Sequence, residues 1–136
     1  MGSKIDLLLA IHSHQPDGNF EWVFAEAYEK SYLPFLKSLY QHPRLKAALH
    51  YSGCLLDWIA AKHPEFIKML KEMVARGQIE MLSGGYYEPI LTLIPERDIL
   101  GQIKLMNEKI KGFTGYEASG LWLTERVWEP TLIKPL

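Results

Sequence analysis

The sequence predicts an α/β protein with a parallel sheet, built from about four consecutive strand–helix units. Short apolar runs alternate with longer amphipathic stretches along the whole chain. This order is typical of βαβ folds, whose helical connections form right-handed crossovers. A closed barrel of such units takes about 250 residues. The 136 residues of this chain therefore correspond to a partial (β/α) barrel.

The four predicted strands are short and apolar, and each is followed by a polar loop. They are expected at residues 5–11, 47–51, 79–82 and 120–123. The first is a continuous apolar run, as in parallel strands that are buried on both faces. Glycine or proline residues in the loops after the strands mark the ends of the regular elements.

Apolar periodicity and proline positions predict the helices. The stretch 21–40 should be divided at Pro34, which suits the first turn of a second helix. Further helices are expected at residues 55–62, 64–76 and 96–113 and from Pro130 onward. In the helix at 64–76, the apolar stripe with i, i+3, i+4, i+7, i+8 spacing predicts a buried face formed by Phe66, Met69, Leu70, Met73 and Val74.

Composition and charge exclude several classes of function. The net charge of −1 and the scattered lysines and arginines argue against binding to nucleic acid or to an anionic membrane. Cys54 is the single cysteine, so no intrachain disulfide forms, and a reducing compartment is indicated. The first apolar run is too short for a signal sequence or a membrane span. We therefore expect a cytoplasmic protein.

Each predicted strand leads into a cluster of polar and aromatic residues. These clusters lie at residues 12–16, 50–53, 84–89 and 122–130. The carboxyl ends of parallel barrel strands share one rim, where such folds carry their catalytic groups. Aromatic faces beside carboxylates are common in pockets that bind sugars. We therefore expect the clusters to form one site.

The first cluster contains His12 and His14, which point the same way in an extended chain. The favoured interpretation is a pair of neutral imidazoles that bind sugar hydroxyls or orient a carboxylate. A metal pair and a purely structural role are alternatives, and the metal is disfavoured because no Asp or Cys lies near in the sequence. We predict no metal and no cofactor. His50 suits the site and the core equally well.

Glu125 is the sharpest catalytic candidate. It lies between Trp122 and Trp128, next to Arg126. A carboxylate that polar partners keep ionised can attack a sugar anomeric carbon as a nucleophile. The alternative is a surface pair formed by Glu125 and Arg126.

Two further glutamates precede prolines. Glu129 lies just before Pro130, where a structural role at a helix start fits. Glu88 lies in an aromatic loop, where it could bind sugar hydroxyls, support Glu125 or cap the loop.

Three segments carry a resemblance to a known family. HSHQPDGNF, GQIEMLSGGYYEPIL and GLWLTERVWEP resemble, in order and spacing, the first three motifs of glycoside hydrolase family 57, in particular its 4-α-glucanotransferase and α-amylase members. The resemblance implies a TIM-like, seven-stranded (β/α) barrel and a retaining mechanism on α-glucans without a metal. Residues 1–136 would form the N-terminal portion of the catalytic barrel domain.

The resemblance also assigns roles to individual residues. Glu125 matches the family nucleophile, and the substrate-binding positions match His12, His14, Glu88 and Trp122. Supporting positions are expected at Gln15, Tyr87, Arg126 and Trp128. The family takes its acid/base, an aspartate, from a later motif that these residues do not contain. Retention requires two carboxyl groups about 5–5.5 Å apart.

The expected partner is an α-glucan such as starch, glycogen or maltodextrin. A second chain, a further C-terminal segment or a homo-oligomer is also expected, because a four-stranded open sheet would expose its edges. Two other functions remain as alternatives. One is a non-catalytic or split remnant that binds glucan or a partner chain. The other is a metal-dependent polysaccharide deacetylase, although the paired aspartates expected after its first strand are missing.

Overall fold

A parallel sheet forms the centre of the molecule. The computed structural model describes residues 5–136, and its strands are β1 (Ala10–Ser13), β2 (Ala47–Tyr51) and β3 (Ile79–Met81), in the order β1-β2-β3. The central strand, β2, pairs in parallel with both neighbours. This arrangement confirms the predicted α/β class, because each connection between strands is helical.

The first strand is displaced from its predicted range. It begins at Ala10, whose partner is Ala48, so the residues before Leu9 extend beyond the start of β2 and find no neighbouring strand. Their side chains are exposed, with Leu8 at 94%. The strand instead continues to Ser13, which pairs with Tyr51. Pairing with β2, rather than apolar character, sets the ends of β1.

The predicted fourth strand is reduced to a single parallel bridge between Ser83 and Leu121. Ser83 donates its N–H to Gly120 O at 2.9 Å, and Trp122 donates its N–H to Ser83 O at 2.8 Å. The regular part of β3 has already ended at Met81, so only this short contact can form. The expected four strand–helix units are therefore three strands and one bridge within residues 5–136.

A long helical stretch connects β1 to β2. It consists of α1 (Glu21–Ala27), the π-helical segment η1 (Tyr28–Tyr32) and α2 (Leu33–Gln41), with Pro34 in the first turn of α2. Proline lacks an N–H, and its ring clashes with a carbonyl of the preceding turn. The wider π segment absorbs this clash, so the predicted division at Pro34 is a local change of winding.

The other helices agree closely with their predicted ranges. They are α3 (Gly53–Lys62), α4 (Pro64–Ala75) and α5 (Glu96–Thr114). Gly115 follows α5 in the left-handed conformation, with φ 77°, which ends the helix without steric strain. The short 3₁₀ segments are η2 (Leu91–Leu93), η3 (Thr124–Arg126) and η4 (Pro130–Ile133). The helix predicted from Pro130 is thus a single 3₁₀ turn.

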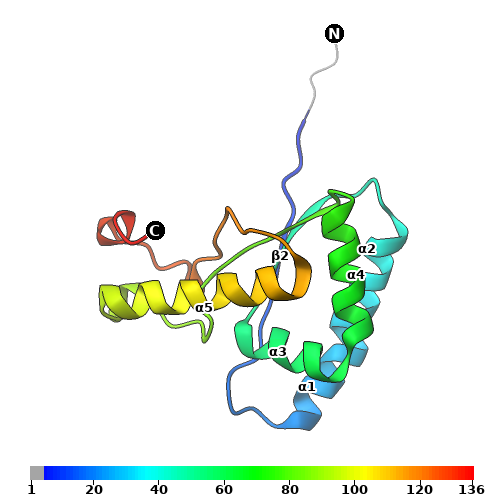
Figure 1. The fold of residues 1–136 in the computed structure, drawn as a ribbon, viewed down its shortest axis with the longest axis horizontal. Helices are drawn as coiled ribbons and strands as arrows, with labels where there is room; N and C mark the ends of the chain where they lie inside the picture. The colour runs from blue at the N-terminus through cyan, green and yellow to red at the C-terminus, as the bar shows by residue number, and fades with distance from the viewer. Residues whose placement is uncertain (1–4) are drawn as a thin grey trace.

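Helices α1 to α4 gather along one side of the strands, and α5 packs on α3 and α4 before extending past them (Figure 1). Phe66, Leu70 and Met73 of the predicted α4 stripe are fully buried, while Met69 and Val74 are partly buried at its border. The side chain of Tyr51 packs against Phe66 in an edge-to-face arrangement. Among residues 5–136, none of the helices combines the length and apolarity needed to cross a membrane.

Candidate active site

The carboxyl ends of β1 and β2 place two histidines side by side. His12 and His50 are register partners in the parallel pair, and their Nδ1 atoms lie 2.8 Å apart. Such a contact requires one nitrogen to donate and the other to accept. The ring of Trp122, which follows the bridge to Ser83, stacks on His12 with centroids 4.5 Å apart and planes inclined by 5°.

The imidazoles of this cluster favour the neutral state. Burial, followed by the nearby charges of His12 and His14, lowers the pKa of His50 to about 3. The pKa values of His12 and His14 are also lowered, mainly by burial. Neutral rings can each offer one donor and one acceptor, which suits contact with sugar hydroxyls.

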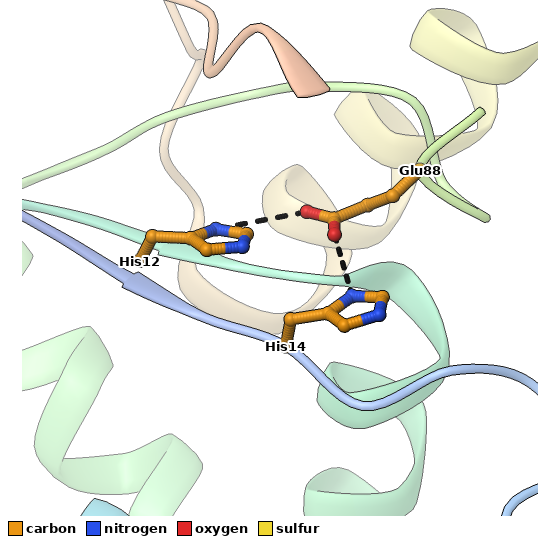
Figure 2. Close-up of side chains that lie close together, drawn as sticks. All are labelled: His12, His14 and Glu88. Carbon is orange, nitrogen blue, oxygen red and sulfur yellow. Dashed lines mark ion pairs between the residues drawn. The ribbon is translucent and has the colours of Figure 1, made fainter. Parts of the chain in front are cut away.

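Glu88 brings a buried carboxyl group into the histidine cluster. Its Oε2 lies 2.5 Å from His14 Nδ1, and its Oε1 lies 3.7 Å from His12 Nδ1 (Figure 2). The Glu88 side chain is only 6% exposed. Burial, followed by the charge of Glu125, raises its pKa to about 7. Burial disfavours the charged form of both partners, which favours a protonated Glu88 carboxyl group beside a neutral His14 ring.

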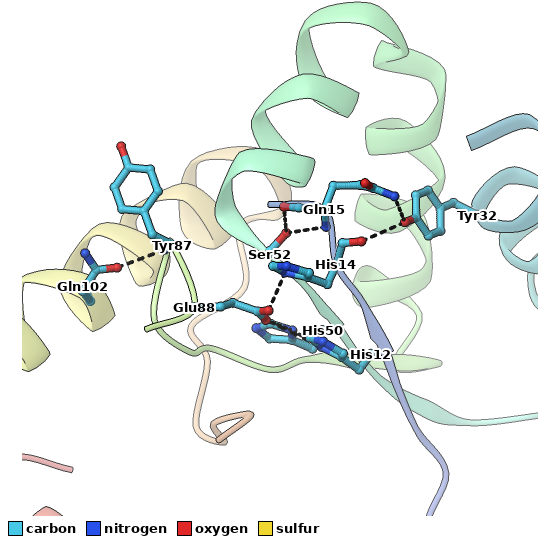
Figure 3. A network of polar contacts seen from close by, with 9 residues as sticks. All are labelled: His12, His14, Gln15, Tyr32, His50, Ser52, Tyr87, Glu88 and Gln102. Atoms are coloured by element: carbon cyan, nitrogen blue, oxygen red, sulfur yellow. Dashed lines mark hydrogen bonds and ion pairs between the residues drawn. The ribbon is translucent and has the colours of Figure 1, made fainter. Parts of the chain in front are cut away.

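Gln15 fixes the loop that carries His14. Its N–H donates to Ser52 Oγ at 3.2 Å, and Ser52 Oγ donates to Gln15 O at 3.1 Å. The Gln15 amide donates to Tyr32 Oη, and that hydroxyl donates to His14 O, both at 3.1 Å (Figure 3). These bonds tie the loop after β1 to α3 and to η1. The supporting role expected for Gln15 in the site stays a prediction.

Tyr87 lies on the rim next to Glu88. Its backbone N–H donates to Gln102 Oε1 of α5 at 2.9 Å (Figure 3), and its side chain is half exposed. The ring meets that of Tyr86 edge to face, with centroids 4.7 Å apart. Its exposed face is available to a ligand.

The segment after the bridge places Glu125 beside the same groups. The negative charge of Glu125 raises the pKa values of Glu88, His12 and His14, and the charge of Arg126 lowers that of His12. Glu125 and Arg126 have φ values of 53° and 57°, a sparsely populated region for such residues. Non-glycine residues with this backbone cluster at functional sites.

Trp128 lies further along the same segment and is 53% exposed. The backbone of Glu129 accepts from Leu132 N–H at 3.0 Å, at the start of η4. This contact agrees with the structural role considered for Glu129.

From the sequence, His50 could belong to either the site or the core. Its side chain is fully buried, yet it contacts His12 Nδ1 and lies 3.4 Å from Glu88 Oε1. The register of β1 and β2 places His50 beside His12, and the sequence motifs do not specify this register. Gly84 belongs to the same neighbourhood, because a Cβ there would lie 2.8 Å from His50 Nε2. Tyr32 was not predicted, whereas Ser52 belongs to the cluster expected at residues 50–53.

Three of these side chains could hold a metal ion. Among the described residues, one ligand atom each from His12, His14 and Glu88 lies within 4.8 Å of the others. Zinc ligands lie about 2.0–2.2 Å from the metal, so they are normally farther apart than the 2.5 Å between Glu88 and His14. The present spacing fits a shared proton better than a common metal.

The fold and the position of this cluster place the chain among (β/α) barrel proteins, whose sites form at the carboxyl ends of the strands. Residues 8–136 match the family described as glycosyl hydrolase family 57. The chain is 52% identical over 136 residues to an α-amylase from Pyrococcus furiosus, covering 100% of this chain and 21% of the relative. The chain belongs to glycosyl hydrolase family 57.

Solved structures show the same relationship. The crystal structure of 4-α-glucanotransferase from Thermococcus litoralis matches with a TM-score of 0.91 and 46% identity, over 94% of this chain and 20% of that one. A family 4 carbohydrate esterase from Streptomyces lividans matches with a TM-score of 0.63 and 16% identity, over 95% of this chain and 56% of that one. This second likeness concerns the fold alone. The chain spans about one fifth of the length of its closely similar relatives.

Proposed function

We propose that this chain forms the nucleophile-bearing part of a retaining α-glucan glycosidase or transglycosidase, with Glu125 as the nucleophile. One arrangement carries the proposal: Trp122 stacks on His12 with centroids 4.5 Å apart, and the segment that follows it holds Glu125, with φ 53°, within electrostatic reach of Glu88, His12 and His14. The names of the relatives, α-amylase and 4-α-glucanotransferase, support an α-glucan as substrate.

In the proposed site, the neutral imidazoles of His12 and His14 hydrogen-bond glucose hydroxyls. Oε1 of Glu88 is buried and has no hydrogen-bond partner among the described residues. Leaving such an atom unpaired is unfavourable, and a sugar hydroxyl would satisfy it. Trp122 and Trp128 offer apolar faces for the sugar ring. Gln15, Tyr87 and Arg126 support this arrangement from the surrounding loops.

The proposed reaction begins when a carboxylate oxygen of Glu125 attacks the anomeric carbon. The bond between that carbon and the departing oxygen breaks, and an acid protonates the oxygen. We propose that this acid is an aspartate outside residues 1–136. Water or the hydroxyl of a sugar acceptor then attacks the glycosyl-enzyme ester and releases Glu125.

A fluorinated α-glucosyl fluoride tests the nucleophile without requiring that acid, because fluoride leaves as an anion. We expect peptide mass spectrometry to find the covalent label on Glu125. The Glu125→Gln variant should take up no label. Glu129→Gln, a neighbouring carboxylate removed in the same way, should be labelled like the wild type. Label on another residue, or a chain that is never labelled, would contradict the assignment of Glu125.

A second candidate is glucan binding without turnover. It is favoured by Glu88 Oε1, which is buried without a hydrogen-bond partner among the described residues and could accept from a sugar hydroxyl whether or not a reaction follows. Calorimetric titration with maltodextrins would show binding, while product analysis would show no cleavage. Covalent labelling of Glu125 would favour the enzymatic proposal over this one.

The deacetylase alternative depends on the three clustered ligand atoms of His12, His14 and Glu88. Metal analysis of the purified chain decides it. We expect no stoichiometric zinc, because the Glu88–His14 spacing suits a shared proton. One equivalent of bound zinc that is lost in a His14→Ala variant would favour the deacetylase.

A further inference from the structure

The loop that carries Glu88 is anchored by two helices that do not themselves enter the site. On the α3 side, Gly53 donates its N–H to Tyr86 O at 2.9 Å. On the α5 side, Gln102 Oε1 accepts the N–H of Tyr87 at 2.9 Å. The two residues directly before Glu88 are thus held through their backbones from opposite directions.

The side chain of Tyr86 adds a charged anchor. Its hydroxyl donates to Asp57 Oδ2 at 2.5 Å, and the same oxygen accepts from Lys109 Nζ at 2.7 Å. Asp57 belongs to α3 and Lys109 to α5. Hydrogen bonds to a charged group are stronger than those between neutral groups. One carboxylate therefore joins the two helices to the loop.

Steric fit restricts the loop further. The Tyr86 ring is 7% exposed and lies so close to α3 that a Cβ on Gly53 would be 2.1 Å from its Cδ2. A Cβ on Gly85 would lie 2.7 Å from Pro89 Cδ. Tyr86 therefore cannot shift towards α3, and residue 85 cannot carry a side chain unless Pro89 moves.

These anchors surround a residue with an unfavourable backbone. Glu88 has φ 53° and closes a turn through its N–H bond to Gly85 O at 3.0 Å. Such conformations persist when the surrounding structure over-determines them. Without the anchors, the turn would relax, and the carboxyl group would move away from His14.

We infer that Asp57 and Tyr86 are positioning residues, which hold the loop so that the Glu88 carboxyl group meets His14 Nδ1. They act through Glu88 and lie outside the histidine cluster. The consequence for catalysis rests on the proposed function, whereas the positioning itself does not. Lys109 completes the arrangement by keeping Asp57 between the two helices.

The test compares Tyr86→Phe with Tyr40→Phe in the full chain. Both changes remove one tyrosine hydroxyl that donates to a carboxylate at 2.5 Å, and the Tyr40 partner is Glu72, between α2 and α4. Tyr40→Phe therefore controls for a general loss of stability. Asp57→Asn is the second variant for the site, because it keeps the shape of the side chain and removes its charge.

Two nuclear magnetic resonance readouts report on Glu88 directly. They are the ¹³C titration of its carboxyl group and the ¹⁵N shifts of the His14 ring. In Tyr86→Phe we expect the titration midpoint of the Glu88 carboxyl group to fall by about one pH unit or more, because the group becomes more exposed to water. The ¹⁵N shift of His14 Nδ1 should change as well. Asp57→Asn should change both in the same direction. Tyr40→Phe should leave both unchanged.

Unaltered Glu88 and His14 signals in a folded Tyr86→Phe or Asp57→Asn variant would overturn the inference. An equal change in Tyr40→Phe would do so as well. The rate of covalent labelling at Glu125 should fall by roughly tenfold to a hundredfold in Tyr86→Phe. If the magnetic resonance changes occur but Glu125 is never labelled, the proposed function fails while the positioning holds. Normal labelling with unchanged signals would refute the positioning alone.

Discussion

The Glu88→Gln substitution tests whether this carboxyl group is protonated in the folded chain near neutral pH. The side chain is 6% exposed, and burial with the charge of Glu125 raises its pKa from 4.5 to about 7. Between these values the folded chain binds more protons than the unfolded chain. The protonated carboxyl group therefore contributes stability that is fully present below pH 4.5 and is lost as the pH rises through 7.

The magnitude follows from the width of this interval. One pKa unit corresponds to about 1.4 kcal/mol, so the carboxyl group changes the free energy of unfolding by about 3 kcal/mol across it. Glutamine has the same shape and does not titrate. At each pH, the free energy of unfolding of Glu88→Gln is subtracted from that of the wild type. We expect this difference to be about 3 kcal/mol smaller above pH 7 than below pH 4.5.

Urea denaturation of both proteins at a series of pH values, followed by tryptophan fluorescence and circular dichroism, measures this difference. Subtraction removes the groups that the two proteins share. Glu117→Gln is the control of opposite sign, because Lys111 lowers the pKa of Glu117. Its difference should rise with pH. For Glu88, a difference that is flat or rises with pH would refute the reasoning, because the carboxylate would then be ionised and paired with a charged His14.

Four further substitutions test packing and burial. Gly53→Ala should lower the free energy of unfolding by about 1–3 kcal/mol, because its Cβ would strike Tyr86. Gly101→Ala lies in the interior of α5, where a Cβ meets nothing within 4 Å, so it should raise the free energy of unfolding by about 0.5–1 kcal/mol. Urea denaturation measures both variants, and a stabilising Gly53→Ala would contradict the packing of Tyr86 on α3. Phe66→Ala, at a fully buried position, should lower the free energy of unfolding by about 3–5 kcal/mol in the same assay. The pKa of His50 is lowered from 6.5 to about 3. The neutral ring therefore contributes to the free energy of unfolding above pH 6.5, and this contribution is lost as the pH falls towards 3. His50→Gln should weaken this acid sensitivity in an acid titration, and an unaltered acid transition would argue against a buried neutral ring.

The helices could be predicted closely because their ends depend on nearby residues. Pro64 begins α4, and Gly115 ends α5 in the left-handed conformation that glycine adopts readily. Pro34 was correctly expected to disturb a long helix. The form of that disturbance, a π segment before the proline, depends on how the whole helix packs.

The strands were predicted less accurately because a strand exists only where it finds a partner. Residues 5–8 are mostly apolar, but they extend beyond the start of β2 and remain unpaired. Leu121 forms one bridge where a full strand was expected. Apolar sequence identifies the candidate segments, while register decides which of their residues pair.

The candidate site shows the same division between local and distant information. The motifs identified His14, Glu88 and Trp122, and the structure brings these residues to one end of the sheet. They did not identify the contact between His12 and His50, which lie 38 residues apart. The link between Asp57 and Tyr86 spans 29 residues and was not predicted. The roles of Glu125, Arg126 and Trp128 in catalysis stay predictions.

The sequence by itself determined the α/β class, the approximate boundaries of α3, α4 and α5, and the family, because periodicity, proline and glycine positions and motif spacing are properties of neighbouring residues. Only the tertiary structure decided which histidine meets Glu88, which carboxyl group is buried and which helices hold the loop of Glu88. Those properties depend on strand register and on the loss of water around groups that are distant in the chain. No local pattern of residues specifies either one.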